Sequence, residues 1–196
     1  MLPDHFVPDD VPYDIVLGID PGTVVLGWGA VLAVPRAPRL LACGVLTAPA
    51  RASVPARLAS LARQLEDLLD AVRPGIVAVE TAFAAINVKS ALRIGEARGV
   101  VLAAAGRRAL AVDEIAPAAA KRAVLGNGRA SKEQVAALVP QLLGLAPGLA
   151  VPLDATDALA LALAHLRRRE APGGSTLARS ARVSSNGGPA PRSTPA

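Results

Sequence analysis

The sequence predicts an α/β fold in which a mixed five-stranded sheet is covered by helices on both faces. Three observations support this prediction. Short apolar runs separated by turn residues occupy the first part of the chain, as expected of strands. The apolar pattern then changes to a helical period, and a fully apolar run follows that is typical of a strand buried inside a sheet. Strands and helices alternate from there on, and the order βββαβαβααα is that of an α/β protein.

Three strand-like runs come first, at residues 14–20, 27–34 and 40–48. Pro21 and Gly22 make a turn between the first two runs, and a short Pro-Arg-Ala-Pro-Arg segment joins the second to the third. Connections this short link neighbouring antiparallel strands. We therefore expect an antiparallel meander at the start of the domain.

A helix is expected over residues 54–72, where leucine and valine recur at the spacing that places them on one helical face. Ser53 precedes this helix as a candidate N-cap, and Pro55 fits its first turn. Residues 75–80 then form the short, fully apolar strand, which ends in Glu80.

The remaining elements are one strand and four helices. They are a helix at 88–106, a strand at 110–115, a short helix at 117–125, a helix that begins after Ser131 and a last helix at 154–169. Ser131 and Gln134 have the spacing of a capping box, and Gly144 fits the end of the helix that follows them.

The chain divides into one domain and two tails. Residues 14–169 carry all the predicted elements. Residues 1–13 hold three Asp and three Pro without periodicity, which predicts a flexible N-terminal extension. Residues 170–196 are rich in Pro, Gly, Ser and Arg, which predicts a disordered tail.

The composition excludes several classes of protein. A single cysteine, Cys43, rules out an internal disulfide and a multi-cysteine metal site, and two histidines are too few for a histidine-based zinc site. No apolar stretch reaches the length of a membrane span, and the N-terminal residues include acids where a signal peptide would be basic. We therefore expect a soluble, cytoplasmic protein with no membrane partner.

Four carboxylates are the candidate functional residues. Asp20 and Glu80 each end an apolar strand. Asp154 and Asp157 lie three residues apart at the start of the last helix, and so on one face of it. Carboxylates from two strand ends and one helix can converge on hard cations such as Mg²⁺, an arrangement that cleaves phosphodiesters.

Three of these acids have a structural alternative when each is taken alone. Asp20 fits a turn, Glu80 an exposed strand end, and Asp154 a helix N-cap. Asp157 heads a wholly apolar stretch, so we expect it to point into a crevice.

The net charge of +5 is unevenly distributed. Residues 167–196 hold six Arg and one Glu, so this segment accounts for the whole excess. Within the rest, residues 81–132 hold nine Lys or Arg against three acids. A basic segment next to the candidate acids suits an enzyme that brings a polyanion to a metal site.

Four sequence blocks follow one another in a fixed order. They are Gly-Ile-Asp-Pro-Gly-Thr at 18–23 with Gly-Trp-Gly at 27–29; Val-Glu-Thr-Ala-Phe at 79–83; Asn87 through Ser-Ala-Leu at 90–92 to Gly-Glu-Ala-Arg-Gly at 95–99; and Asp-Ala-Thr-Asp-Ala-Leu-Ala at 154–160. In this order and spacing, the blocks closely resemble the RuvC family of Holliday-junction resolvases. Any one block is weak evidence, whereas four collinear blocks from about residue 14 to residue 168 are strong evidence.

The resemblance implies an RNase H-like fold and a homodimer. It implies a structure-selective endonuclease that resolves four-way (Holliday) DNA junctions by paired, symmetric nicks in homologous recombination and DNA repair. The acids that bind metal and act in catalysis would be Asp20, Glu80, Asp154 and Asp157. Two Mg²⁺ ions per active site are expected, with Mn²⁺ as a substitute.

Further residues match the family outside the four acids. Lys121 and Lys132 match basic, DNA-contacting positions near the active site, and Phe83 matches an aromatic residue that stacks at the opened junction. Solvated charge at a helix end is the alternative for the lysines, and core packing for Phe83. The helix at 88–106 matches the dimer helix, and its alternative is ordinary core packing. The resemblance also implies a branch-migration complex of the RuvA and RuvB type as a partner.

Three other functions compete with this interpretation. A compact RNase H-like nuclease that acts on ribosomal RNA precursors shares the Gly-Ile-Asp-Pro-Gly-Thr opening, but the Gly-Glu-Ala-Arg-Gly and Asp-Ala-Thr-Asp blocks argue against it. Sugar and acetate kinases also open with Gly-Ile-Asp, but they need two such domains. A junction-binding protein without cleavage activity would have no need to retain all four acids.

Overall fold

The structure, a computed structural model, describes residues 14–81, 88–146 and 151–171. The predicted N-terminal extension and the tail from residue 172 onward lie outside the described residues, and so does Phe83. The boundaries predicted for the two tails therefore stay predictions.

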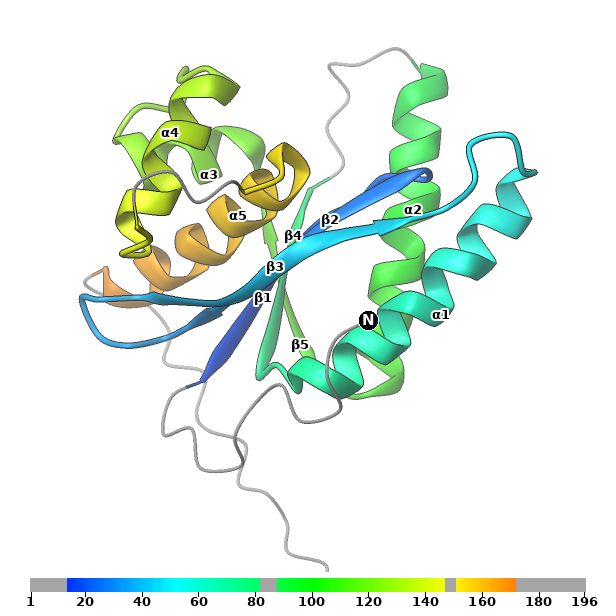
Figure 1. Ribbon diagram of the computed structural model, residues 1–196, viewed down its shortest axis with the longest axis horizontal. Helices are drawn as coiled ribbons and strands as arrows, with labels where there is room; N and C mark the ends of the chain where they lie inside the picture. Colours follow the sequence, from blue (N-terminus) through cyan, green and yellow to red (C-terminus); the bar gives the residue numbers. More distant parts are fainter. Residues whose placement is uncertain (1–13, 82–87, 147–150, 172–196) are drawn as a thin grey trace, which may run out of the picture.

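The sheet has five strands in the order β3-β2-β1-β4-β5 (Figure 1). The strands are β1 (Ile15–Asp20), β2 (Val25–Leu32), β3 (Arg39–Thr47), β4 (Ile76–Glu80) and β5 (Ala111–Ile115). The antiparallel meander is confirmed for β1, β2 and β3, whereas β4 and β5 run parallel to β1. The predicted mixed five-stranded sheet is therefore confirmed.

Helices cover both faces of this sheet, as predicted (Figure 1). One face carries α1 (Val54–Val72) and α2 (Val88–Arg107), and the other carries α3 (Pro117–Leu125), α4 (Lys132–Leu142) and α5 (Leu153–Glu170). Every predicted strand and helix is present, and the bounds lie within two residues of those expected.

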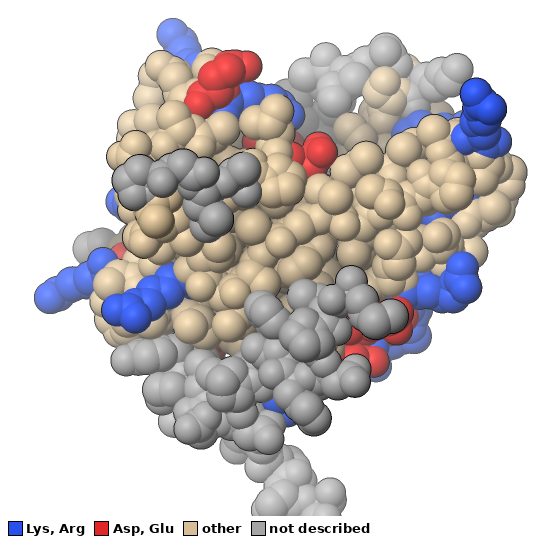
Figure 2. Space-filling model, viewed as in Figure 1, with Lys and Arg blue, Asp and Glu red and all other residues tan. Residues whose placement is uncertain are grey.

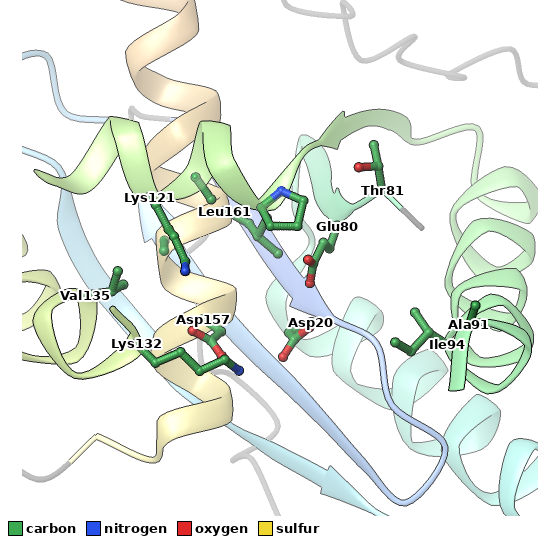
Figure 3. A pocket seen from close by; sticks show the side chains of 13 residues that line it. Asp20, Glu80, Thr81, Ala91, Ile94, Lys121, Lys132, Val135, Asp157 and Leu161 are labelled. Carbon is green, nitrogen blue, oxygen red and sulfur yellow. The ribbon is translucent and has the colours of Figure 1, made fainter. Parts of the chain in front are cut away.

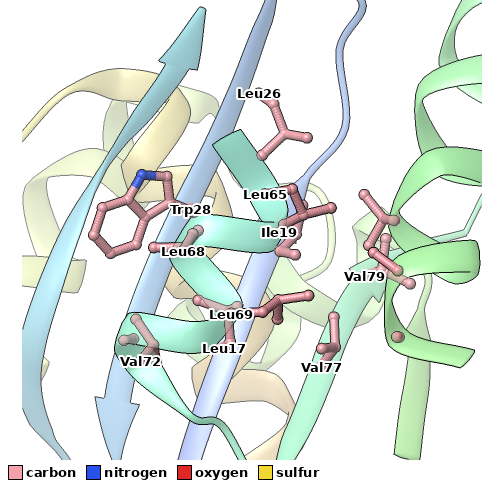
Figure 4. Close-up of a cluster of buried hydrophobic side chains, with 14 of the residues drawn as sticks. Leu17, Ile19, Leu26, Trp28, Leu65, Leu68, Leu69, Val72, Val77 and Val79 are labelled. Carbon is pink, nitrogen blue, oxygen red and sulfur yellow. The ribbon is translucent and has the colours of Figure 1, made fainter. Parts of the chain in front are cut away.

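The strands supply a separate hydrophobic core to each helical layer, because successive side chains of a strand point to opposite faces. Leu17 and Ile19 of β1 face α1, where they join Leu65 and Leu69 in one buried cluster (Figure 4). Val16 faces the other way and belongs to the cluster built with α3, α4 and α5. Each buried leucine or isoleucine contributes about 1.5–3 kcal/mol by leaving water, so both layers are firmly attached to the sheet.

Helix α5 lies unusually close to β1 and β2 because glycines replace side chains at the contact. A Cβ atom added to Gly18 would collide with the carbonyl oxygen of Ala158, and one added to Gly27 would collide with that of Asp154. A Cβ atom on Gly29 would meet the side chain of Leu159. The glycines of the first sequence block thus allow the backbone of α5 to rest on the sheet.

The helix ends largely follow their sequence signals. The predicted capping box of α4 is confirmed: the Ser131 hydroxyl accepts a hydrogen bond from the backbone N–H of Gln134, and the Gln134 side chain accepts one from the backbone N–H of Ser131. Gly144 follows α4 with φ of 67°, as its role at the helix end requires. Ser53 occupies the N-cap position of α1, but its side chain makes no capping hydrogen bond.

Charged side chains lie mainly at the periphery of the molecule in the view of Figure 2, around a centre that is largely uncharged. Within the described parts of the chain, no helix has the length and the apolar character needed to cross a membrane.

Candidate active site

Two carboxylates meet at one edge of the sheet because their strands are parallel neighbours. Asp20 is the last residue of β1 and Glu80 the last residue of β4, and the preceding residues Ile19 and Val79 are paired in register. Ile19 and Val79 point into the core under α1, so the next residue of each strand faces the opposite helical layer. The apolar runs therefore deliver two carboxylates side by side.

A third carboxylate comes from the helix that lies on these strands. Asp157 is in the first turns of α5, which packs on β1 and β2, and its side chain is 27% exposed. Asp20, Glu80 and Asp157 all line one pocket of about 340 Å³ (Figure 3). Asp157 thus points into a crevice at the edge of the sheet.

Asp154 lies one helical turn before Asp157 and outside the residues that line the pocket. Its side chain is exposed, although its charge is close enough to raise the pKa of Asp20. The N-cap of α5 is Pro152, so the alternative role of Asp154 as the N-cap is wrong. Asp154 therefore belongs to the rim of the site.

The surroundings of Asp20 and Glu80 disfavour the charged form of both carboxyl groups. Burial raises the pKa of Asp20, and the nearby charge of Asp157 raises it further. Burial, the charge of Asp20 and a hydrogen bond with Asp20 raise the pKa of Glu80 to about 7. Near neutral pH the two groups therefore share a proton for part of the time, which relieves the repulsion between them.

Two lysines supply the positive charge of the pocket. Lys132, the first residue of α4, donates a hydrogen bond of 2.8 Å from its Nζ to Oδ2 of Asp157. This contact raises the pKa of Lys132. Lys121 lies on α3 and lines the same pocket from the side opposite Glu80's strand end (Figure 3).

The donor set of this pocket suits a divalent cation. Carboxylate oxygens are the ligands that hard cations prefer. Burial, together with the charges of neighbouring carboxylates, raises the pKa values of Asp20 and Glu80, and a bound cation would instead favour their charged forms. Across the described ranges, however, no three Asp, Glu, His or Cys side chains form a ready-made metal-binding group. The carboxylates share a pocket while one of them is paired with Lys132, so binding a cation requires side chains to move.

The pocket also has an apolar wall that the sequence analysis did not predict. Its remaining lining residues come from four helices and from the residue after β4; they are Thr81, Ala91, Ile94, Pro117, Ala120, Val135, Ala160 and Leu161. Apolar residues at these positions are indistinguishable in sequence from those of the core. Of these lining residues, only Thr81 could have been predicted from the sequence, because it directly follows Glu80.

The order of the five strands and the carboxylate-lined pocket at their edge define the class of RNase H-like nucleases. A family model described as crossover junction endodeoxyribonuclease RuvC matches residues 16–165. The chain belongs to this family, whose members are metal-dependent nucleases. The predictions of the fold, the family and the nuclease class are therefore confirmed.

Individual relatives agree with this assignment. The RuvC of Dehalococcoides mccartyi strain 195 is 46% identical over 154 residues, which cover 79% of this chain and 93% of the relative. The RuvC of Nitratidesulfovibrio vulgaris strain DP4 is 45% identical over 154 residues, with coverage of 79% and 91%.

Solved structures show the same likeness. A structure of Thermus thermophilus RuvC in complex with Holliday junction substrate superposes with a TM-score of 0.71 at 35% identity, over 78% of this chain and 93% of that one. The yeast mitochondrial Holliday junction resolvase Ydc2 superposes with a TM-score of 0.55 at 16% identity, over 80% of each chain, and so supports the fold alone.

Proposed function

We propose that this protein resolves four-way DNA junctions by paired, symmetric nicks, and that Asp20, Glu80, Asp157 and Asp154 are its catalytic acids. The observation that carries the proposal is the meeting of three carboxylates and two lysines from β1, β4, α3, α4 and α5 in one pocket. Membership of the RuvC family supports the choice of substrate.

Asp20, Glu80 and Asp157 would hold two Mg²⁺ ions, with Asp154 completing the set from the rim and Mn²⁺ as a substitute. Such ions activate the attacking water and neutralise the oxygen that leaves. The fold itself contributes by holding the carboxylates in place. The rigid ends of β1 and β4 fix two carboxylates, and the close packing of α5 on the glycines of the sheet fixes the third.

Lys121 and Lys132 would bind the phosphates next to the bond that is cut. A cation near a reacting phosphate acts most strongly on the negative charge that develops in the transition state. Replacing either lysine by alanine should therefore lower the rate of cleavage more than it lowers junction affinity. Equal losses would instead mark the lysine as an ordinary contact to the DNA backbone.

A homodimer through α2 is the second part of the proposal. Val88 and Leu92 on this helix are 77% and 64% exposed, although they are large and apolar. Gly95 and Gly99 continue the same face, and an added Cβ atom at either position would meet no atom of the described residues within 4 Å. Exposed apolar side chains followed by small residues allow the close approach of a second helix, and a two-fold axis would present two active sites to the two equivalent strands of a junction.

Three further roles are proposed from the resemblance. Phe83 would stack on bases at the opened junction, close in sequence to Glu80. A branch-migration complex of the RuvA and RuvB type would deliver the junction. The protein would act in the cytoplasm, where chromosomal DNA recombines.

A cleavage assay tests the proposed function directly. We expect a four-way junction to be nicked in the presence of Mg²⁺, and a linear duplex of the same sequence to be cut far more slowly. Structured RNA is the third substrate, and its preferential cleavage would favour an RNA-processing nuclease instead. Junction binding without any nicking would favour a binding protein, and Asp157→Asn is the control for contaminating nucleases.

A further inference from the structure

Lys132 forms an ion pair with Asp157, whereas a lysine that only binds DNA phosphates would extend into solvent in the free protein. Its Nζ lies 2.8 Å from Oδ2 of Asp157, within the pocket that also holds Asp20 and Glu80 (Figure 3). The two side chains come from different helices, α4 and α5, and from positions 25 residues apart. The ammonium group thus covers an oxygen that a cation would need.

The helix dipole does not favour a basic residue at position 132. It is the first residue of α4, where the positive end of the helix dipole disfavours a cation. The capping box between Ser131 and Gln134 fixes the backbone at this point, so the lysine side chain can move without disturbing the helix. Its nearest described carboxylate partner is Asp157, which accounts for its orientation.

The two partners differ in their freedom to move. The Asp157 side chain is 27% exposed and lies in the first turns of α5, whereas the Lys132 side chain is 73% exposed. An ion pair this open to solvent is weak and is readily exchanged. Lys132 can therefore swing away from Asp157, while Asp157 stays in the pocket.

We propose that Lys132 serves as an internal counter-ion: it holds Asp157 in the free enzyme, competes with the metal ion for that carboxylate, and passes to a DNA phosphate when the metal takes its place. The inference rests on the proposed role of Asp157 as a metal ligand. Because metal binding would release Lys132 for the phosphate, metal and DNA should strengthen each other's binding by the same factor. The free enzyme would in this way keep its metal affinity low until a junction arrives.

The test is a calorimetric titration of the full chain with Mn²⁺ in the absence of DNA. Lys132→Met removes the ammonium group and keeps the length of the side chain, and we expect it to bind Mn²⁺ about two- to fivefold more tightly than the wild type, as the loss of an exposed ion pair permits. Lys121→Met is the matched control, because it removes a charge from the same pocket and leaves the contact to Asp157 intact. Its effect should be clearly smaller.

The outcomes separate this inference from the proposed function. If Asp157→Asn binds Mn²⁺ as well as the wild type does, the proposed ligand role of Asp157 is wrong. If Asp157→Asn binds Mn²⁺ poorly but Lys132→Met does not differ from the wild type, or changes no more than Lys121→Met, the counter-ion role alone is overturned.

A second measurement tests the transfer of Lys132 to DNA. Ca²⁺ should increase the affinity of the wild-type protein for a four-way junction, as measured by fluorescence anisotropy. We expect this increase to be smaller in Lys132→Met than in Lys121→Met, because only Lys132 is released by the metal. An increase in Lys132→Met as large as that of the wild type would contradict the transfer.

Discussion

At the scale of single residues, the site concentrates negative charge that the fold itself does not need. Asp20 and Glu80 end strands whose other residues are buried and apolar, and burial raises the pKa of both carboxyl groups. Carboxylates in this situation reduce the stability of the protein unless a proton or a cation compensates them. A loss of stability of this kind is typical of residues that act in catalysis.

Conservative replacement of the acids should separate cleavage from binding. We expect Asp20→Asn, Glu80→Gln and Asp157→Asn each to slow junction nicking about a hundredfold or more, because each removes a charged oxygen from the proposed metal site. Junction affinity in a gel-shift assay should stay close to that of the wild type, since less negative charge does not hinder DNA.

Asp154→Asn provides a comparison for these three variants. Its exposed position at the rim predicts a smaller loss of nicking. Cleavage within about tenfold of the wild-type rate in a variant of Asp20, Glu80 or Asp157 would remove that residue from the proposed catalytic set.

The raised pKa of Glu80 predicts how stability depends on pH. Between its ordinary value of 4.5 and about 7, the folded protein holds a proton on Glu80 that the unfolded chain has released. Stability is therefore lost as pH rises through this window. Glu80→Gln removes the titration, so its melting temperature in EDTA should exceed that of the wild type at pH 8, and the difference should shrink at pH 5.

The exposed Asp67 of α1 supplies the control for this experiment. Asp67→Asn should not reproduce the pH-dependent difference. A difference between Glu80→Gln and the wild type that is the same at pH 5 and pH 8 would show that Glu80 does not titrate in this range.

At the scale of elements, the contact between α5 and the sheet decides where the third carboxylate lies. Gly18 and Gly27 bring the backbone of α5 against β1 and β2 at Ala158 and Asp154, and Asp157 lies between these two contact points along the helix. The helix is buried along Ala155 to His165 apart from Asp157 itself. A small displacement of α5 would therefore move Asp157 relative to Asp20.

Gly18→Ala should test this role of close packing. The added methyl group would collide with the backbone of α5, and overpacking of this kind costs about 1–3 kcal/mol. We expect a lower free energy of unfolding in denaturant and a larger loss of nicking than of junction binding, because Asp157 is displaced.

Gly106→Ala is the matched control, because it lies in α2 with open space around an added Cβ atom. Alanine is favoured over glycine in a helix by up to about 1 kcal/mol, so this variant should be as stable as the wild type or more so. Equal effects of the two substitutions would mean that α5 can shift to accommodate the methyl group without cost.

At the scale of the whole molecule, one face of α2 is left exposed by the described residues of the single chain. The buried side of this helix includes Val101, Ala104 and Ala105, which pack toward α1 and the sheet. Val88, Leu92, Gly95 and Gly99 follow one another on the exposed side. This division of the helix is the expected result if a second copy of the chain covers it.

Leu92→Glu should therefore weaken the proposed dimer. A buried charge without a partner opposes association, so we expect analytical ultracentrifugation to find more monomer than in the wild type at the same micromolar concentration. The two strands of a junction should then be cut independently. Leu153→Glu is the control, because Leu153 is 68% exposed at the start of α5. A wild-type chain that is monomeric and fully active would contradict the dimer itself.

The sequence by itself determined the elements of this protein and the residue types of its site. Strand and helix periods are local properties, so the bounds of all ten elements follow from them to within two residues. The ends of β1 and β4 could be recognised as carriers of Asp20 and Glu80 because the apolar runs stop there. The capping box of α4 could also be predicted, because its two residues are only three positions apart in the sequence.

Only the tertiary structure decided which of these residues meet. Lys132 pairs with Asp157 because α4 packs beside α5, and the wall of the pocket is assembled from helices far apart in the sequence. Asp154 and Asp157 share a helical face, yet the packing of α5 on the sheet leaves Asp154 exposed and places Asp157 in the pocket. These contacts depend on how whole elements pack against one another. The local periodicity of the sequence does not encode which elements become neighbours.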